Sequence, residues 1–134
     1  MSDQGWIAPS LTDFEAMAQH AQASLPSQFK ARLGPLVVRI ADFAPADVLK
    51  DLRINDAYEL TGLYDGIALT EQSIDALPTA PATVWLYRRA ILDEWALRGD
   101  VGLQQLITHV LIHEIAHHFG YSDDDIARID DWRF

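Results

Sequence analysis

The sequence predicts an α+β domain built around one small sheet. A helical pattern comes first, short apolar strand-like runs follow in the middle of the chain, and helical patterns return toward the end. The chain has 134 residues, 49% of them hydrophobic, which suffices for one core without disulfides. We therefore expect residues 1–134 to form a single domain, with 1–10 as a loose lead-in.

The stretch LTDFEAMAQHAQASL, residues 11–25, predicts the first helix. Thr12 and Glu15 have the spacing of a capping box, in which each side chain caps the other residue's backbone. Pro26 then interrupts the helical pattern. The apolar residues of this stretch fall on one helical face and are candidates for the core: Phe14, Met17, Ala18, Ala21 and Leu25.

Three runs in the middle of the chain have the length and composition of strands. PLVVRIADF, residues 35–43, is rich in β-branched and apolar side chains. A short helix is expected after Pro45, because proline favours the first turn of a helix. TGLYDGIALT, residues 61–70, reads as a strand containing turn residues, and ATVWLYRRAIL, residues 82–92, reads as a longer strand.

The C-terminal third is predicted to be helical. Asp93–Glu94 is expected to open a short helix that ends at Gly99, because glycine is common just beyond a helix C-terminus. Asp100 is a candidate cap for a helix over about 101–119. Ser122 is a candidate cap for a last helix, DDDIARIDDW.

Charge and composition exclude several classes of function. The net charge of −10 argues against nucleic-acid binding, which needs clustered Lys and Arg. The first residues lack the basic and apolar regions of a signal peptide, and no apolar run is long enough to span a membrane, so we expect a soluble, cytoplasmic protein. The chain has no cysteine, so a transition metal would be held by imidazole and carboxylate groups.

The segment HEIAHH, which begins at His113, contains the pattern H-E-x-x-H. On a helix, His113 and His117 are one turn apart and can direct their rings at one point. Glu114 lies about 100° from His113 and about 60° from His117 around the helix. This arrangement supplies two zinc ligands and a carboxylate that can take a proton from water. About 0.007 such matches are expected by chance in a chain of this composition.

A third ligand is predicted shortly after the helix. Gly120 permits the positive φ that ends a helix sharply, so the chain can turn back toward the two histidines. Asp123 lies three residues further on and can complete a three-ligand site with water in the fourth position. Asp124 and Asp125 are alternatives, and all three acidic residues would also suit a helix N-terminus without any metal.

With its flanking segments GLYDG and VWLYRRAIL, the stretch HEIAHHFGYSDDD resembles small bacterial zincin-like proteins described as Zn-dependent proteases with a matrix-metalloprotease-like domain. The resemblance spans roughly residues 36–128. It implies a minimal zincin-like domain whose small mixed sheet packs against the helix carrying H-E-x-x-H. It also implies His113, His117 and Asp123 as metal ligands and Glu114 as catalytic base. Unlike metzincins, the sequence has Asp in place of a third His and no methionine after the motif.

Other residues near the motif have weaker functional signals. His109 and His118 are expected either to be structural or to contact the metal ligands without binding the metal. Tyr64, Tyr87 and Tyr121 are candidate donors to an oxyanion opposite the metal, although tyrosines in strands usually belong to the core. The strand containing Trp85 and Tyr87 could hold an extended peptide along its edge.

The function predicted from these residues is zinc-dependent hydrolysis of peptide bonds, with one Zn²⁺ per chain and a peptide or protein as substrate. One alternative is a metal-stabilised zincin-like binding module that cleaves nothing, since a chain this small has little material for a deep cleft. Another is a helix whose histidines are purely structural and bind no metal.

Overall fold

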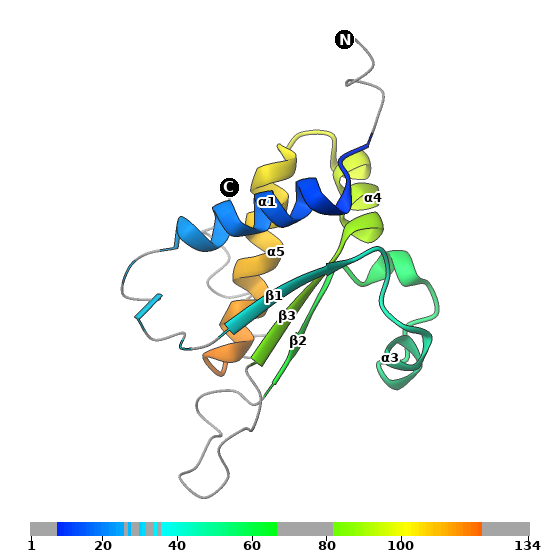
Figure 1. Cartoon of the computed structure of the whole chain (residues 1–134). Coiled ribbons are helices and arrows are strands. Elements are labelled where there is room, and N and C mark those ends of the chain that lie inside the picture. Colours follow the sequence, from blue (N-terminus) through cyan, green and yellow to red (C-terminus); the bar gives the residue numbers. More distant parts are fainter. Residues whose placement is uncertain are drawn as a thin grey trace, which may run out of the picture.

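The computed structural model places helices around a three-stranded sheet (Figure 1). It describes residues 8–25, 27, 30–31, 34, 36–66 and 82–121. The elements are α1 (Leu11–Ala23), β1 (Leu36–Ala41), α3 (Ala46–Asp51), the 3-10 helix η2 (Ala57–Glu59), β2 (Gly62–Asp65), β3 (Ala82–Tyr87), α4 (Arg88–Arg98) and α5 (Leu103–His118). The predicted α+β class is confirmed. No helix within these residues is long and apolar enough to cross a membrane.

The sheet is mixed and has the strand order β1-β3-β2. β1 runs parallel to β3, with Val38 opposite Val84. β2 runs antiparallel to β3, with Tyr64 opposite the same Val84. The suggestion that an edge of the strand containing Trp85 holds a peptide is wrong, because β1 and β2 occupy both edges of β3.

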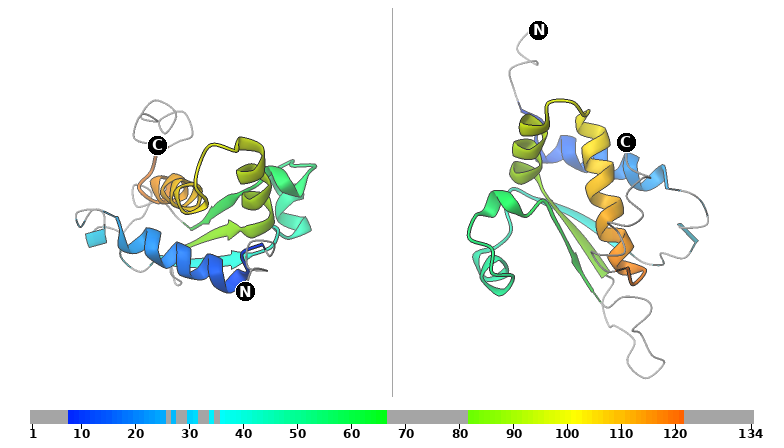
Figure 2. Two further views of the ribbon diagram at one scale, coloured as in Figure 1. Left: turned by 90° about the horizontal axis from the view of Figure 1, so that it is seen from above. Right: turned by 180° about the vertical axis from the view of Figure 1, so that it is seen from behind.

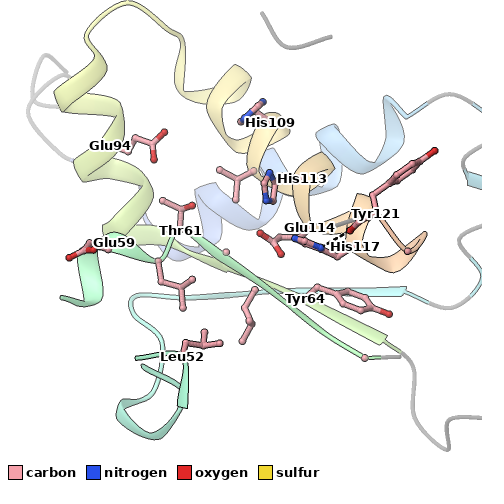
Figure 3. Close-up of a pocket in the computed structure, with 16 residues that line it drawn as sticks. Leu52, Glu59, Thr61, Tyr64, Glu94, His109, His113, Glu114, His117 and Tyr121 are labelled. Atoms are coloured by element: carbon pink, nitrogen blue, oxygen red, sulfur yellow. Dashed lines mark hydrogen bonds between the residues drawn. The ribbon is translucent and has the colours of Figure 1, made fainter. Parts of the chain in front are cut away.

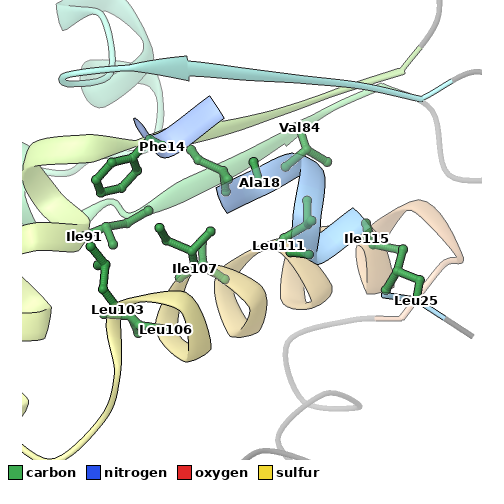
Figure 4. Packing of buried hydrophobic residues seen from close by; sticks show 13 residues of the cluster. Phe14, Ala18, Leu25, Val84, Ile91, Leu103, Leu106, Ile107, Leu111 and Ile115 are labelled. Atoms are coloured by element: carbon green, nitrogen blue, oxygen red, sulfur yellow. The ribbon is translucent and has the colours of Figure 1, made fainter. Parts of the chain in front are cut away.

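The main core lies between this sheet, α1 and α5 (Figure 4). Side chains alternate between the two faces of a strand, so Val84 and Leu86 point from β3 into this core. α5 runs alongside β2 and β3 (Figure 2). The largest fully buried side chains contributed by the two helices are Phe14 from α1 and Leu106, Ile107 and Leu111 from α5. The apolar face predicted for the first helix is confirmed, since Phe14, Ala18, Ala21 and Leu25 are buried and Met17 packs against them.

A smaller apolar cluster covers part of the opposite face of the sheet. Tyr87 is 1% exposed and stacks on Trp85, with ring centroids 6.5 Å apart. Ala90, on the first turn of α4, packs against Tyr87. Val48 and Leu49 of α3 complete the cluster, so the short helix predicted after Pro45 serves to cover this face.

The boundary between β3 and α4 differs from the prediction. The strand ends at Tyr87, and a helix begins directly at Arg88, where the sequence pattern predicts continued strand to residue 92. Ala90 and Ile91 are fully buried in the helix. Residues of an apolar run can be buried in either a strand or a helix, so such a run does not locate the change. The predicted end at Gly99 is confirmed, with φ of 72° at that residue.

Two helix starts also differ from the prediction. The capping box of α1 joins Ser10 and Asp13, whose side chain and backbone groups exchange hydrogen bonds of 2.9 and 3.1 Å, in place of Thr12 and Glu15. α5 starts after Gly102, whose backbone N–H donates to the side chain of Gln105 over 3.0 Å, so Asp100 is not its cap. The helix predicted after Ser122 lies outside the described residues.

Candidate metal centre

A cavity of about 810 Å³ lies between α5 and the segment that runs from η2 through β2 (Figure 3). Its wall combines imidazole, carboxylate and apolar side chains from elements distant in sequence. The lining residues are Leu52, Glu59, Leu60, Thr61, Gly62, Leu63, Tyr64, Gly66, Glu94, His109, Val110, His113, Glu114, His117, Gly120 and Tyr121. All three residues of the H-E-x-x-H pattern are therefore on one cavity.

The helical period of α5 explains why its histidines face this cavity. Leu106, Ile107, Leu111 and Ile115 are buried in the core and fix the rotation of the helix about its axis. Residues four apart share a face, so the row 109, 113 and 117 is turned away from that core and toward the cavity. The core side of α5 thus orients its imidazoles.

His113 and His117 lie close together at the wall of the cavity. Their ring centroids are 5.3 Å apart, with the ring planes inclined by 72°. Nδ1 of His117 lies 3.0 Å from the backbone oxygen of Tyr121. A carbonyl oxygen only accepts hydrogen bonds, so Nδ1 carries the proton and, in the neutral ring, Nε2 carries the lone pair. Backbone hydrogen bonds of this kind orient metal-binding histidines.

The turn at the end of α5 brings that carbonyl oxygen to His117. Gly120 has φ of 94°, in the region that favours glycine. The N–H of Gly120 donates to the carbonyl of His117 over 2.9 Å, and the N–H of Tyr121 donates to the carbonyl of Ala116 over 3.0 Å. These two bonds form a Schellman motif, so the prediction that Gly120 ends the helix sharply is confirmed.

Glu114 lines the cavity beside the two histidines and is partly buried. Its side chain lies against β2, because a Cβ atom added to Gly62 would be 3.2 Å from Cγ of Glu114. Figure 3 shows the carboxylate near the ring of His117 and on the cavity side of α5. This placement suits a group that takes a proton from a water held at the histidines.

His118 and the three tyrosines named from the sequence have different positions. His118 is 3% exposed, and its Nδ1 lies 2.8 Å from the hydroxyl of Tyr64, as expected for a histidine that packs beside the site or supports it. Tyr64 and Tyr121 line the cavity. Tyr87 does not, since it lies in the cluster on the far face of the sheet, and its candidacy as an oxyanion donor is wrong.

Several lining residues carry no signal in the sequence. Glu94 reaches toward the part of the cavity bordered by His109, and it forms an ion pair with Arg98 at 3.4 Å on its own helix (Figure 3). Thr61 and Gly62 come from β2 and the residue before it. Only the folded chain brings these residues to α5, because nothing in their spacing refers to the histidine motif.

The described donors fit part of a catalytic zinc site. Two imidazoles one turn apart on a helix are two of the three protein ligands that such a site needs. Asp123, the predicted third ligand, and its alternatives Asp124 and Asp125 lie outside the described residues. Within the part of the chain that the structure describes, no group of three or more His, Cys, Asp or Glu side chains could hold a metal ion.

Comparison with known families identifies one that covers most of the chain. Residues 33–133 match the family model of zincin-like metallopeptidases, so the chain belongs to this family. The match includes β1, the cavity and all of α5. The comparison with curated proteins gave no match.

Proposed function

We propose that this protein is a zinc-dependent peptidase that binds one Zn²⁺ per chain. The observation that carries the proposal is the placement of His113, Glu114 and His117 on one cavity, with Nδ1 of His117 hydrogen-bonded to a backbone carbonyl. Membership of the zincin-like metallopeptidase family supports the same activity. His113 and His117 would hold the zinc through ring nitrogens, and Asp123 would supply the third ligand.

Bound zinc would supply a Lewis acid that makes water more acidic and polarises a peptide carbonyl. The other steps belong to side chains of this protein. The Glu114 carboxylate would accept the proton that the attacking water loses and then deliver it to the leaving amine. The Tyr121 carbonyl would hold the His117 ring in one orientation through both steps. The cavity would bind the segment of a peptide or protein on either side of the cleaved bond.

Metal content and hydrolysis test this proposal together. We expect elemental mass spectrometry of tag-free protein to give about one zinc per chain, and the Asp123→Ala variant to retain less, because each zinc site needs about three protein ligands. Glu114→Gln should keep its zinc and lose hydrolysis of a peptide library by about 100-fold or more.

The outcomes separate the competing functions. Zinc without chelator-sensitive cleavage by the wild type would favour the binding module over the peptidase. No zinc, even after zinc is offered and the excess is removed, would reject both and leave the histidines structural. Equal hydrolysis by wild type and Glu114→Gln would reject Glu114 as the base.

A further inference from the structure

β2 packs against a second row of side chains on α5, beside the row of His109, His113 and His117. Residues 110, 114 and 118 are spaced by four and therefore share a helical face. Gly62 and Tyr64 are two residues apart on β2 and therefore share a face of the strand. Gly62 lies against Val110 and Glu114, and Tyr64 lies against His118. Glu114 thus stands in the row that touches the sheet.

Gly62 leaves no room for a side chain at this contact. An added Cβ would lie 2.9 Å from Cγ1 of Val110, 3.2 Å from Cγ of Glu114 and 3.2 Å from the backbone oxygen of Trp85. Such distances are shorter than ordinary carbon contacts of about 3.5–4.0 Å. Among the described glycines, those with positive φ are Gly34, Gly99 and Gly120, so Gly62 is not required by its backbone conformation. Glycine is needed here for space.

We propose that Gly62 is a positioning residue for Glu114. It lets β2 approach α5 closely enough to set where the stem of this side chain lies, and hence where the carboxylate stands relative to His113 and His117. This inference rests on the proposed function, in which the Glu114 carboxylate moves the proton. Gly62 itself takes no part in the chemistry.

The strand cannot simply move away to accommodate a larger residue. Two positions along β2, the Tyr64 hydroxyl and Nδ1 of the buried His118 are 2.8 Å apart and tie the strand to the end of α5. On its other side, β2 is paired with β3, where Gly62 is opposite Leu86. A side chain at position 62 would therefore displace the flexible groups in front of it, which are the side chains of Val110 and Glu114.

A displaced base should lower turnover without removing the metal. A reacting group misplaced by about 1 Å can cost about 100-fold in rate, so a shift of a few tenths of an ångström should cost less. In the Val110→Ala background, which removes the closest contact, we expect Gly62→Ala to lower kcat about three- to tenfold. KM and zinc affinity should stay within about twofold, since the row that carries His113 and His117 is not touched.

A second measurement detects the contact without any hydrolysis. Gly62→Ala is introduced into Val110→Ala proteins that carry either Gln or Ala at position 114. Gln keeps Cγ at its place and Ala removes it, whereas the contact with the Trp85 oxygen is the same in both. We expect Gly62→Ala to lower the thermal midpoint by about 2 °C more with Gln than with Ala, measured by calorimetry on metal-free protein.

If Gly62→Ala lowers the thermal midpoint equally with Gln and with Ala at position 114, residue 62 does not press on the Glu114 side chain. If Gly62→Ala leaves kcat unchanged, Gly62 does not position Glu114. A loss of zinc affinity as large as the loss of kcat would also overturn the positioning role, because Gly62 would then act on the ligands. Absence of hydrolysis by the wild type would reject the proposed function and, with it, this role of Gly62. The calorimetric comparison would still decide whether Gly62 fixes the Glu114 side chain.

Discussion

The hydroxyl of Tyr87 is buried at the end of the central strand. Tyr87 is 1% exposed. Burial raises the pKa of this hydroxyl to about 12, because the charged phenolate loses its hydration, and the nearby carboxylates Asp65 and Glu114 add a smaller effect in the same direction. Glu114 lines the cavity on one face of the sheet, and its negative charge also disfavours the Tyr87 phenolate on the other face.

This raised pKa predicts a loss of stability at alkaline pH. Below pH about 10, Tyr87 is protonated in both the folded and the unfolded chain. Between pH about 10 and 12, the unfolded chain loses this proton while the folded chain keeps it, so the free energy of unfolding falls as pH rises. We expect Tyr87 to contribute about 3 kcal/mol to the complete fall, because its pKa is raised by about two units and each unit is worth roughly 1.4 kcal/mol.

Urea unfolding of wild type and Tyr87→Phe from pH 8 to pH 12 measures this contribution. The free energy of unfolding of the wild type should fall more steeply above pH 10 than that of the variant, which lacks the ionising hydroxyl. Parallel curves for the two proteins would show that the hydroxyl is not shielded from water.

At the scale of elements, the end of α5 joins a structural turn to the candidate metal centre. The Schellman motif at Gly120 and the hydrogen bond from His117 Nδ1 share the same short segment, because the Tyr121 carbonyl follows directly after the glycine. α4 ends on a similar turn at Gly99, where φ is 72° and an added Cβ would meet nothing within 4 Å. The two turns differ in their distance from the histidines.

That difference predicts separate effects of two equivalent substitutions. Gly120→Ala and Gly99→Ala should each lower the free energy of unfolding by about 1 kcal/mol, because a side chain is disfavoured at positive φ. Only Gly120→Ala should also weaken zinc binding, by about 10-fold, since it disturbs the carbonyl that orients His117. Chelator competition measures the zinc affinity. Equal zinc affinity in the two variants would contradict a role for the turn in orienting the ring.

Element types were predictable from the sequence where hydrophobic periodicity was regular, and their boundaries were not. The face of α1 and the strand β1 follow directly from apolar spacing. The change from strand to helix after Tyr87 does not, because apolar residues continue beyond Arg88 and Arg89 and their burial satisfies either structure. Thr12 fits a capping box as well as Ser10 does, so the sequence pattern does not distinguish the two starts.

At the scale of the molecule, the cavity wall is acidic, as the whole chain is. The net charge is −10. The described cavity wall contains the carboxylates of Glu59, Glu94 and Glu114, and no Lys or Arg is among those lining residues. The ion pair of Glu94 with Arg98 is half-exposed, and such pairs hold their partners weakly. A negative cavity attracts cationic segments of a substrate.

We therefore expect peptides with Lys next to the cleaved bond to be preferred over matched peptides with Glu there, by about 10-fold in kcat/KM at low ionic strength. Salt should reduce this ratio, because it screens exposed charges. Glu94→Gln should reduce the ratio too. Glu15→Gln, which changes an exposed carboxylate of α1 outside the cavity wall, should not. A ratio independent of salt and of Glu94 would mean that charge does not select the substrate.

The sequence predicts the helical half of the candidate site in more detail than the rest, for which it offered only the tyrosines Tyr64 and Tyr121 as lining residues. His113, Glu114 and His117 belong to one helix, so their spacing fixes their relative directions before the rest of the fold is known. Thr61, Gly62 and Glu94 reach the cavity through strand pairing and helix packing, which depend on the whole molecule. The roles of Gly62 as a spacer and of the Tyr121 carbonyl as a hydrogen-bond acceptor leave no mark in residue type or spacing.

The sixteen residues of α5 fill the core with one side and carry the candidate ligands His113 and His117 on another. Inserting or deleting one residue within this helix would rotate everything beyond it by about 100°. A change between Leu106 and His113 would then send the histidines toward the sheet or Leu111 toward water. A point substitution in α5 can alter either the candidate site or the core packing alone. A change in the length of α5 alters both at once, so we expect insertions and deletions in relatives to fall outside this helix.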